Sequence, residues 1–362
     1  MHVQLFAGPV RPQATASTTR PVLQRTPRIL GTPEPSRPVP VPLYHFSPPE
    51  SYRPRGIVHF LGGAFAGATP QLLYPGLIRQ LSKAGYAVIS TPYAVTFRHL
   101  DCAQRVQEAF EAALAELRVD RLRRWAVPQG LPVHGIGHSN GALLHLLIGC
   151  QQATPNQSNI IISFNNKEVK DAIPVPLDGL QAAVSTIPQT AFSQPALTAF
   201  DLLRSAGDLL ASVGVPVDKP QLLAAAPGLD QIRSVFEEVR NGDLEFTPPP
   251  EQSRAMISSR YRTPRTLLVR FADDPIDETR LMYPILSSRG SSQGVPHTSH
   301  RKGCEELVLP GSHATPCFGA DPPQVGRSFS PSDAILQGIN AFAQMDLNRC
   351  CDRIIGWLDS TN

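Results

Sequence analysis

The sequence predicts an α/β protein with a mostly parallel, doubly wound sheet. Between residues 57 and 358, short apolar runs alternate with segments of helical periodicity, which indicates parallel strands with helices on both faces of the sheet. The chain has 362 residues and is 41% hydrophobic, so it can bury a core of this size. Its 26 Gly and 37 Pro predict many loops and exclude a coiled coil or a long helical bundle.

The expected elements follow in chain order, and several carry a boundary signal. A glycine pair ends the first strand, Gly85 stops the first helix and Asp101 caps the second. The expected strands cover residues 57–61, 86–90, 131–136, 159–164, 266–271 and 306–309. The expected helices cover residues 70–84, 101–117, 142–150 and 333–358.

A helical cap insertion is expected over about 167–262. The segment between the strands at 159–164 and 266–271 has no clear strand and is too long for a structureless loop. Leu- and Ala-rich pieces at 196–213 and 221–239 would supply its helices. Because the insertion is rich in Leu, Ala, Val and Pro and poor in charge, we expect an apolar cap.

Residues 1–50 differ from the rest of the chain. They hold five Arg, eleven Pro and no Lys, and their only acids are Glu34 and Glu50. An Arg-rich, hydroxyl-rich, acid-poor segment matches an organelle transit peptide, and the alternative is a disordered Pro-rich tail. The expected organisation is this N-terminal segment followed by one folded domain over 51–362.

Composition argues against several kinds of partner and site. Lys and Arg number 33 against 30 Asp and Glu, and a net charge of +3 is too small and too dispersed for a nucleic-acid binder. The six cysteines form no Cys-x-x-Cys pair, so neither a zinc site nor a disulfide scaffold is expected. The apolar run at 142–148 is far shorter than the roughly 20 residues of a membrane span, so we expect a soluble protein without metal or cofactor.

The pentapeptide Gly-His-Ser-Asn-Gly at 137–141 has the Gly-x-Ser-x-Gly form of a nucleophile elbow. In such an elbow a sharp strand-to-helix turn lifts the serine hydroxyl above the sheet, and glycines allow close backbone approach. The five-residue pattern alone is weak evidence for a nucleophile. The alternative is a serine in a glycine-flanked turn that has no catalytic role. The context is more specific, because an expected strand precedes it and an expected helix follows it. Ser139 is therefore the candidate nucleophile of an α/β-hydrolase fold.

An acid should follow the serine along the chain, because this fold orders its catalytic side chains as serine, acid and histidine. The strand at 266–271 is followed by an acidic loop. Asp274 is the expected acid in that loop, because Pro275 holds it extended at the strand's end. Asp273 and Asp277 are alternates, and Asp277 could equally cap the next helix.

His313 is the expected general base. A serine hydroxyl is a poor nucleophile until a base removes its proton. His313 lies in a turn directly after the strand at 306–309, at the same sheet edge as the serine. Other histidines have simpler explanations: His59 is inside a strand, His145 is inside a helix, and His138 is the variable residue of the pentapeptide.

Two backbone amides should hold the oxyanion of a tetrahedral intermediate. Asn140, the residue after the nucleophile, supplies one, and the loop after the first strand supplies the other from Gly63 or Ala64. Asn165 and Asn166 follow another strand at the same edge. Their side-chain amides are expected either to orient a substrate or to shape a turn.

Seven stretches of the chain share a further, longer pattern. They lie at 59–65, 90–93, 137–139, 163–167, 245–248, 271–279 and 311–316. Together they resemble the α/β-hydrolase-like family of cyanobacteria and plastids called domain of unknown function 1350. Asn140 departs from that family's pattern, in which an aliphatic residue is expected. The resemblance implies the fold and a plastid location, or the cytoplasm of a cyanobacterium, but it implies no substrate.

The sequence thus predicts a serine hydrolase that acts on a carboxylic ester. The expected apolar cap favours a small lipophilic acyl ester, and a thioesterase or acyltransferase would use the same residues. The alternative is a non-catalytic binding or assembly factor that retains the hydrolase fold. Three competent side chains in the expected order argue against this alternative.

Overall fold

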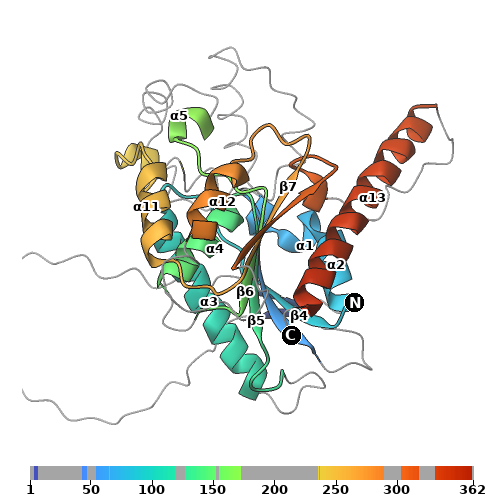
Figure 1. Cartoon of the computed structure of the whole chain (residues 1–362), viewed down its shortest axis with the longest axis horizontal. Helices are drawn as coiled ribbons and strands as arrows, with labels where there is room; N and C mark the ends of the chain where they lie inside the picture. Colours follow the sequence, from blue (N-terminus) through green and yellow to red (C-terminus); the bar gives the residue numbers. More distant parts are fainter. Residues whose placement is uncertain are drawn as a thin grey trace, which may run out of the picture.

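Eight strands form one sheet in the order β1-β2-β4-β3-β5-β6-β7-β8 (Figure 1). The structure is a computed structural model that describes residues 4–6, 43–46, 54–64, 66–119, 127–151, 155–172, 235, 237–288, 303–317 and 331–360. The strands are β1 (Gln4–Phe6), β2 (Leu43–Phe46), β3 (Gly56–Leu61), β4 (Tyr86–Ser90), β5 (Val133–His138), β6 (Ser158–Ile162), β7 (Thr266–Phe271) and β8 (Cys304–Leu309). The six strands from β3 to β8 are parallel to their neighbours, while β1 and β2 add an antiparallel edge.

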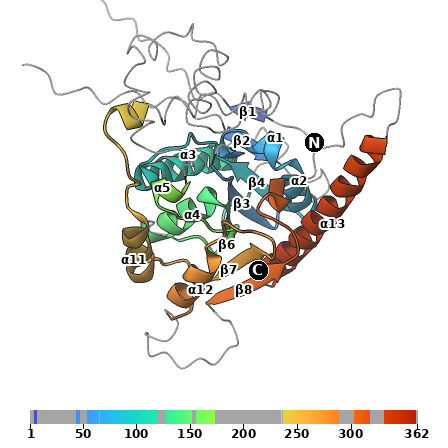
Figure 2. The same cartoon turned by 90° about the horizontal axis from the view of Figure 1, so that it is seen from above.

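Helices cover both faces of this sheet (Figure 2). They are α1 (Pro70–Leu73), α2 (Pro75–Lys83), α3 (His99–Val119), α4 (Asn140–Gln151), α5 (Val169–Ala172), α11 (Pro250–Arg260), α12 (Thr279–Ser287) and α13 (Pro331–Asp359). Helices α2 and α13 lie on one face, and α3 and α4 lie on the other (Figure 2). This is the doubly wound arrangement that the alternation of elements predicts.

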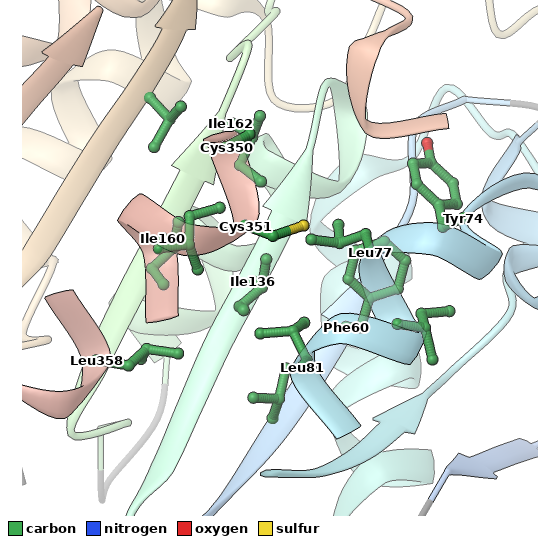
Figure 3. Packing of buried hydrophobic residues seen from close by; sticks show 14 of the residues in the cluster. Phe60, Tyr74, Leu77, Leu81, Ile136, Ile160, Ile162, Cys350, Cys351 and Leu358 are labelled. Carbon is green, nitrogen blue, oxygen red and sulfur yellow. The ribbon is translucent and has the colours of Figure 1, made fainter. Parts of the chain in front are cut away.

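Every residue of β3 is buried, because each face of the strand packs under a different helical layer. Val58 and Phe60 pack with α2 and α13, whereas Ile57 and Leu61 face the layer that contains α3 and α4. Figure 3 shows the first of these clusters, in which Leu77 and other apolar side chains fill the space between sheet and helices. A strand buried on both faces holds the loop at its carboxyl end firmly.

The connections after β3 and β5 leave the sheet in opposite directions. From β3 the chain passes to β4 on one side, and from β5 it passes to β6 on the other, although β3 and β5 are neighbours. In open parallel sheets such a point leaves a crevice at the carboxyl ends of the strands, where ligands bind. The loops at 62–64 and 139–140 therefore meet at the position where a binding site is expected.

Most expected elements agree with the observed ones within about two residues, as is usual for helix and strand ends. The single helix expected over 70–84 is wrong. The chain leaves helical geometry at Tyr74, where φ is −126°, and Pro75 starts α2 as its first residue. The strand expected over 131–136 lies two residues further on, so that His138 is its last residue.

The described part of the N-terminal segment forms two short strands. β2 pairs antiparallel with β4 and β1 pairs with β2, and the transit peptide expected over residues 1–50 stays a prediction. An edge strand needs only backbone partners, which composition does not reveal. Most of the expected cap, including the helix expected over 196–213, lies outside the described residues, and α5 and α11 are the described helices at its two ends.

None of the described helices is both long enough and apolar enough to cross a membrane. All six cysteines lie among the described residues, where they form no disulfide, and five of them are buried.

Candidate active site

Ser139 occupies a strained turn between β5 and α4. Its φ is +56°, in the left-handed region that non-glycine residues seldom adopt. The turn is held in place because the Ser139 amide donates to the Ile162 carbonyl at 2.9 Å and the Ser139 carbonyl accepts from the Ala142 amide at 3.0 Å. Ser139 is half-buried, and its hydroxyl makes no hydrogen bond with the part of the chain that the structure describes.

The two glycines of the pentapeptide are required by backbone crowding. A Cβ on Gly137 would lie 2.3 Å from the Gly141 carbonyl oxygen, and a Cβ on Gly141 would lie 2.3 Å from the Leu61 carbonyl oxygen. Backbone atoms cannot move aside as a flexible side chain can. The glycines thus allow the first turn of α4 to press against the end of β3, as expected for a nucleophile elbow.

His313 and Asp274 form a close pair beside this turn. Asp274 follows β7, His313 follows β8, and the Nδ1 of His313 lies 2.8 Å from the Oδ2 of Asp274. The Asp274 side chain is fully buried, whereas the His313 side chain is 25% exposed. Asp274 is held further by its Oδ1, which accepts from the Ile276 amide at 3.2 Å. With its Nδ1 proton donated to the carboxylate, His313 keeps a bare Nε2 that can accept a proton.

The two loops that carry this pair are joined by backbone hydrogen bonds. The Ala272 amide donates to the Leu309 carbonyl at 2.8 Å, and the Asp273 amide donates to the Gly311 carbonyl at 3.0 Å. Gly311 has a φ of +117°, and a Cβ there would lie 2.4 Å from the Thr315 hydroxyl oxygen, so the turn before His313 needs glycine. These contacts fix the separation between the acid and the imidazole.

The alternative acids have other surroundings. Asp273 is exposed. The Oδ1 of Asp277 accepts a short hydrogen bond from the Thr279 hydroxyl, but the N-cap residue of α12 is Glu278, so Asp277 does not cap this helix. Burial raises the pKa of Asp277. Of the three candidates, the structure brings only Asp274 to His313.

His138 links the serine turn to the base loop. Its ring centroid lies 4.8 Å from that of His313, and its Nε2 lies 2.9 Å from the His313 carbonyl oxygen. The pKa of His138 is lowered to about 3, mainly by burial and next by the neighbouring His313 ring. His138 is therefore neutral, and sequence reasoning gave it no role because one variable position carries no signal of its own.

The two candidate oxyanion amides of the β3 loop have different partners. The Gly63 amide donates to the Tyr74 hydroxyl at 2.8 Å. Among the described residues, no partner is found for the Ala64 amide or for the Asn140 amide. Gly63 nevertheless lies beside the nucleophile, because a Cβ on it would be 3.1 Å from the Ser139 Cβ. The oxyanion role of these amides stays a prediction, in which Ala64 and Asn140 are the candidates whose amides have no partner among the described residues.

The asparagines after β6 bond to the protein rather than pointing freely into solvent. The Asn165 side-chain amide donates to the Ile276 carbonyl at 2.9 Å, and the backbone amide of Asn166 donates to the Glu278 carboxylate at 2.7 Å. Asn166 is also buried. These bonds tie the loop after β6 to the acid loop after β7, which corresponds to the turn-shaping alternative.

No group of three or more His, Cys, Asp or Glu side chains that could hold a metal ion is found among the described residues. The side-chain groups that meet at this edge of the sheet are a hydroxyl, an imidazole and a carboxylate. The strand order, the elbow after β5 and the chain order of Ser139, Asp274 and His313 are those of an α/β-hydrolase fold.

The family described as "Protein of unknown function (DUF1350)" matches residues 49–360, and the chain belongs to this family. No curated protein is significantly similar to it in sequence.

Several solved structures resemble the chain at low identity. A soluble variant of monoglyceride lipase from Saccharomyces cerevisiae, in complex with a substrate analogue, is 13% identical over 91% of this chain and 94% of that one, with a TM-score of 0.47. A monoacylglycerol lipase from Paleococcus ferrophilus is 13% identical over 90% and 100%, with a TM-score of 0.43. The thioesterase domain from the curacin biosynthetic pathway is 12% identical over 83% and 95%, with a TM-score of 0.42. Likenesses at this level carry no information on the substrate of this chain.

Proposed function

We propose that this member of the DUF1350 family is a serine hydrolase that cleaves carboxylic esters. The observation that carries the proposal is the His313–Asp274 pair, 2.8 Å apart, beside a serine in a strained strand-to-helix turn. A buried carboxylate on one imidazole nitrogen orients the ring and stabilises its protonated form. The His313 side chain is 25% exposed, and the proposal takes its Nε2 as the nitrogen that meets the substrate.

In the proposed reaction, the Ser139 hydroxyl oxygen attacks the ester carbonyl carbon while His313 Nε2 takes the hydroxyl proton. The amides of Asn140 and Ala64 stabilise the resulting oxyanion. The tetrahedral intermediate expels the alcohol, which takes the proton back from His313. A water molecule then attacks the acyl-serine, again giving its proton to His313, and the acid product leaves as the Ser139 hydroxyl is restored.

A lipophilic acyl group is the proposed substrate feature. Ile276 lies two residues after Asp274 and is 38% exposed. An exposed apolar side chain so close in the chain to the acid supports an apolar substrate. The expected apolar cap over 167–262 supports the same preference. Acyl transfer to an acceptor other than water would use the same side chains.

The test is labelling of the full chain with a fluorophosphonate probe, alongside Ser139→Ala and His313→Ala. We expect the wild type to label and both variants to lose labelling, with release of p-nitrophenol from esters that increases with acyl-chain length. A folded wild type that does not label contradicts the proposal and favours the non-catalytic binding role. Labelling that survives in Ser139→Ala would mean that another side chain is the nucleophile.

The plastid location expected from residues 1–50 stays a prediction. A fluorescent fusion of the full chain, compared with one that lacks these residues, tests it.

A further inference from the structure

Two buried tyrosines bind opposite ends of one peptide bond beside the nucleophile. The Gly63 amide donates to the Tyr74 hydroxyl at 2.8 Å, and the Tyr93 hydroxyl donates to the Gly62 carbonyl at 2.6 Å. The Gly62 carbonyl and the Gly63 amide belong to the same planar peptide unit. With both ends bound, this unit cannot rotate without breaking a buried hydrogen bond.

Each tyrosine ring has room because a glycine faces it. A Cβ on Gly62 would lie 2.6 Å from the Tyr74 ring, and a Cβ on Gly67 would lie 2.6 Å from the Tyr93 ring. Tyr74 is fully buried and Tyr93 is 7% exposed. In Figure 3 the Tyr74 ring lies near Phe60 and Leu77 with its hydroxyl pointing away from these apolar side chains. The two hydroxyls thus approach the loop from inside the protein.

Tyr74 connects this peptide to the residue before the nucleophile. The Tyr74 hydroxyl oxygen lies 2.9 Å from His138 Nδ1, and His138 Nε2 lies 2.9 Å from the His313 carbonyl oxygen. A carbonyl oxygen can only accept, so the neutral His138 carries its proton on Nε2 and accepts at Nδ1. Tyr74 therefore donates to His138 and accepts from Gly63, and the Cys317 thiol is a further hydrogen-bonding neighbour of its hydroxyl.

Tyr93 connects the same peptide to the residue after the nucleophile. The side-chain amide of Asn140 donates to the Tyr93 hydroxyl oxygen at 3.3 Å, while that hydroxyl donates to the Gly62 carbonyl. An aliphatic residue at 140 could not make this bond. The Asn140 side chain thus has a specific partner in this chain.

We propose that Tyr74 and Tyr93 are positioning residues that clamp the Gly62–Gly63 peptide and thereby aim the next amide, that of Ala64, at the oxyanion formed on Ser139. The inference rests on the proposed function. Both tyrosines act through backbone amides and do not touch the substrate. Because the clamp is tied to His138 and Asn140, the oxyanion loop, the nucleophile and the base loop keep one fixed relative position.

The test measures saturation kinetics of fluorophosphonate labelling for the full chain. The variants are Tyr74→Phe, Tyr93→Phe and the double variant, each of which keeps the ring and removes the hydroxyl. The matched control is Tyr261→Phe, because Tyr261 is also buried and its hydroxyl is bonded to Asn159 and to Thr266, the first residue of β7, rather than to the Gly62–Gly63 peptide. We expect kinact to fall at least about tenfold in each single variant and about 100-fold in the double variant, with KI unchanged. Tyr261→Phe should keep the wild-type kinact within about threefold.

An unchanged kinact in both single clamp variants, measured while the wild type labels, overturns the inference and leaves the proposed function standing. A loss in Tyr261→Phe equal to that of the clamp variants also overturns it, because the effect would then be general destabilisation. If a tyrosine variant does not fold, Asn140→Leu replaces it, since it keeps the backbone amide and removes only the bond to Tyr93. An unchanged kinact in Asn140→Leu overturns the Tyr93 half of the clamp. A folded wild type that never labels rejects the proposed function and the clamp together.

Discussion

Two regions of the molecule hold pairs of histidines, and the pairs differ in their partners. At the carboxyl edge of the sheet, His138 and His313 lie with ring centroids 4.8 Å apart. Beneath α4, His59 and His145 lie with ring centroids 4.9 Å apart. Three of these four rings are buried and bonded to neutral groups, whereas His313 is partly exposed and bonded to a carboxylate.

The interior pair shows what burial alone does to an imidazole. The Nε2 of His59 lies 2.7 Å from the Thr91 hydroxyl, and the Nε2 of His145 lies 3.0 Å from the His59 carbonyl oxygen. Burial lowers the pKa of His59 well below its usual value and that of His145 to about 4. The comparison teaches that a position at the edge of the site does not by itself make a histidine a base. His138 lies at that edge but is buried and neutral like the interior pair, whereas only His313 is bonded to a carboxylate.

The largest expected effect tests the carboxylate partner. Asp274→Asn should lower the fluorophosphonate labelling rate about 10³- to 10⁴-fold, because an amide can neither hold the His313 tautomer nor stabilise the imidazolium. Thr91→Val is the matched interior change, since it removes the hydroxyl that bonds to His59. Labelling of Thr91→Val should stay within about threefold of wild type. Equal losses of labelling rate in the two variants would contradict the special role given to the carboxylate partner of His313.

The next effect concerns the dependence of stability on pH. The pKa of buried His145 is about 4 in the folded chain, below the roughly 6.5 of an unfolded histidine. Between these values the unfolded chain binds a proton that the folded chain does not, so the free energy of unfolding is highest above pH 6.5 and falls as the pH drops toward 4. The loss is on the order of 1–3 kcal/mol for one such histidine.

Urea unfolding of wild type and His145→Gln at several pH values between 7 and 4.5 measures this loss. Gln keeps an N–H donor for the His59 carbonyl but does not titrate in this range, so the variant should lose less stability with acid. Its labelling rate at pH 7.5 should match wild type. Parallel pH curves for the two proteins would show that His145 does not titrate on unfolding as this argument requires.

The smallest expected effect separates the three carboxylates of the acid loop. Asp273→Asn should leave the labelling rate within about twofold of wild type, because the side chain is exposed. Asp277→Asn should lower the rate less than about tenfold, since an amide oxygen can still accept from the Thr279 hydroxyl. If either variant lost as much as Asp274→Asn, the assignment of the acid would have to move to that residue.

The sequence already predicted much of this fold. The parallel strands are continuous apolar runs, and such a run is enough to predict a strand that is buried on both faces. The elbow could be predicted because its glycines, strand and helix are contiguous in the chain. The single helix expected over 70–84 was wrong, because Tyr74 leaves helical geometry directly before Pro75.

The candidate site was predictable only as far as local order allowed. The order of Ser139, Asp274 and His313 was visible in the sequence, but the choice among three acids needed the distance to His313. The different partners of Gly63 and Ala64 depend on the Tyr74 hydroxyl, which arrives from the break between α1 and α2. The sequence did not indicate that Tyr93 binds Gly62 or that His138 binds Tyr74, because the residues around each position give no information about a partner far away in the chain.

The sequence by itself thus determined the sheet, the serine turn and the set of candidate site residues, since each depends on neighbours along the chain. The tertiary structure decided which carboxylate meets His313, which hydroxyl binds the Gly63 amide and which partner the Asn140 side chain has. The physical reason is the parallel sheet, which brings loops separated by long crossovers to one edge. There a hydrogen bond is decided by a few tenths of an ångström, which no local pattern encodes.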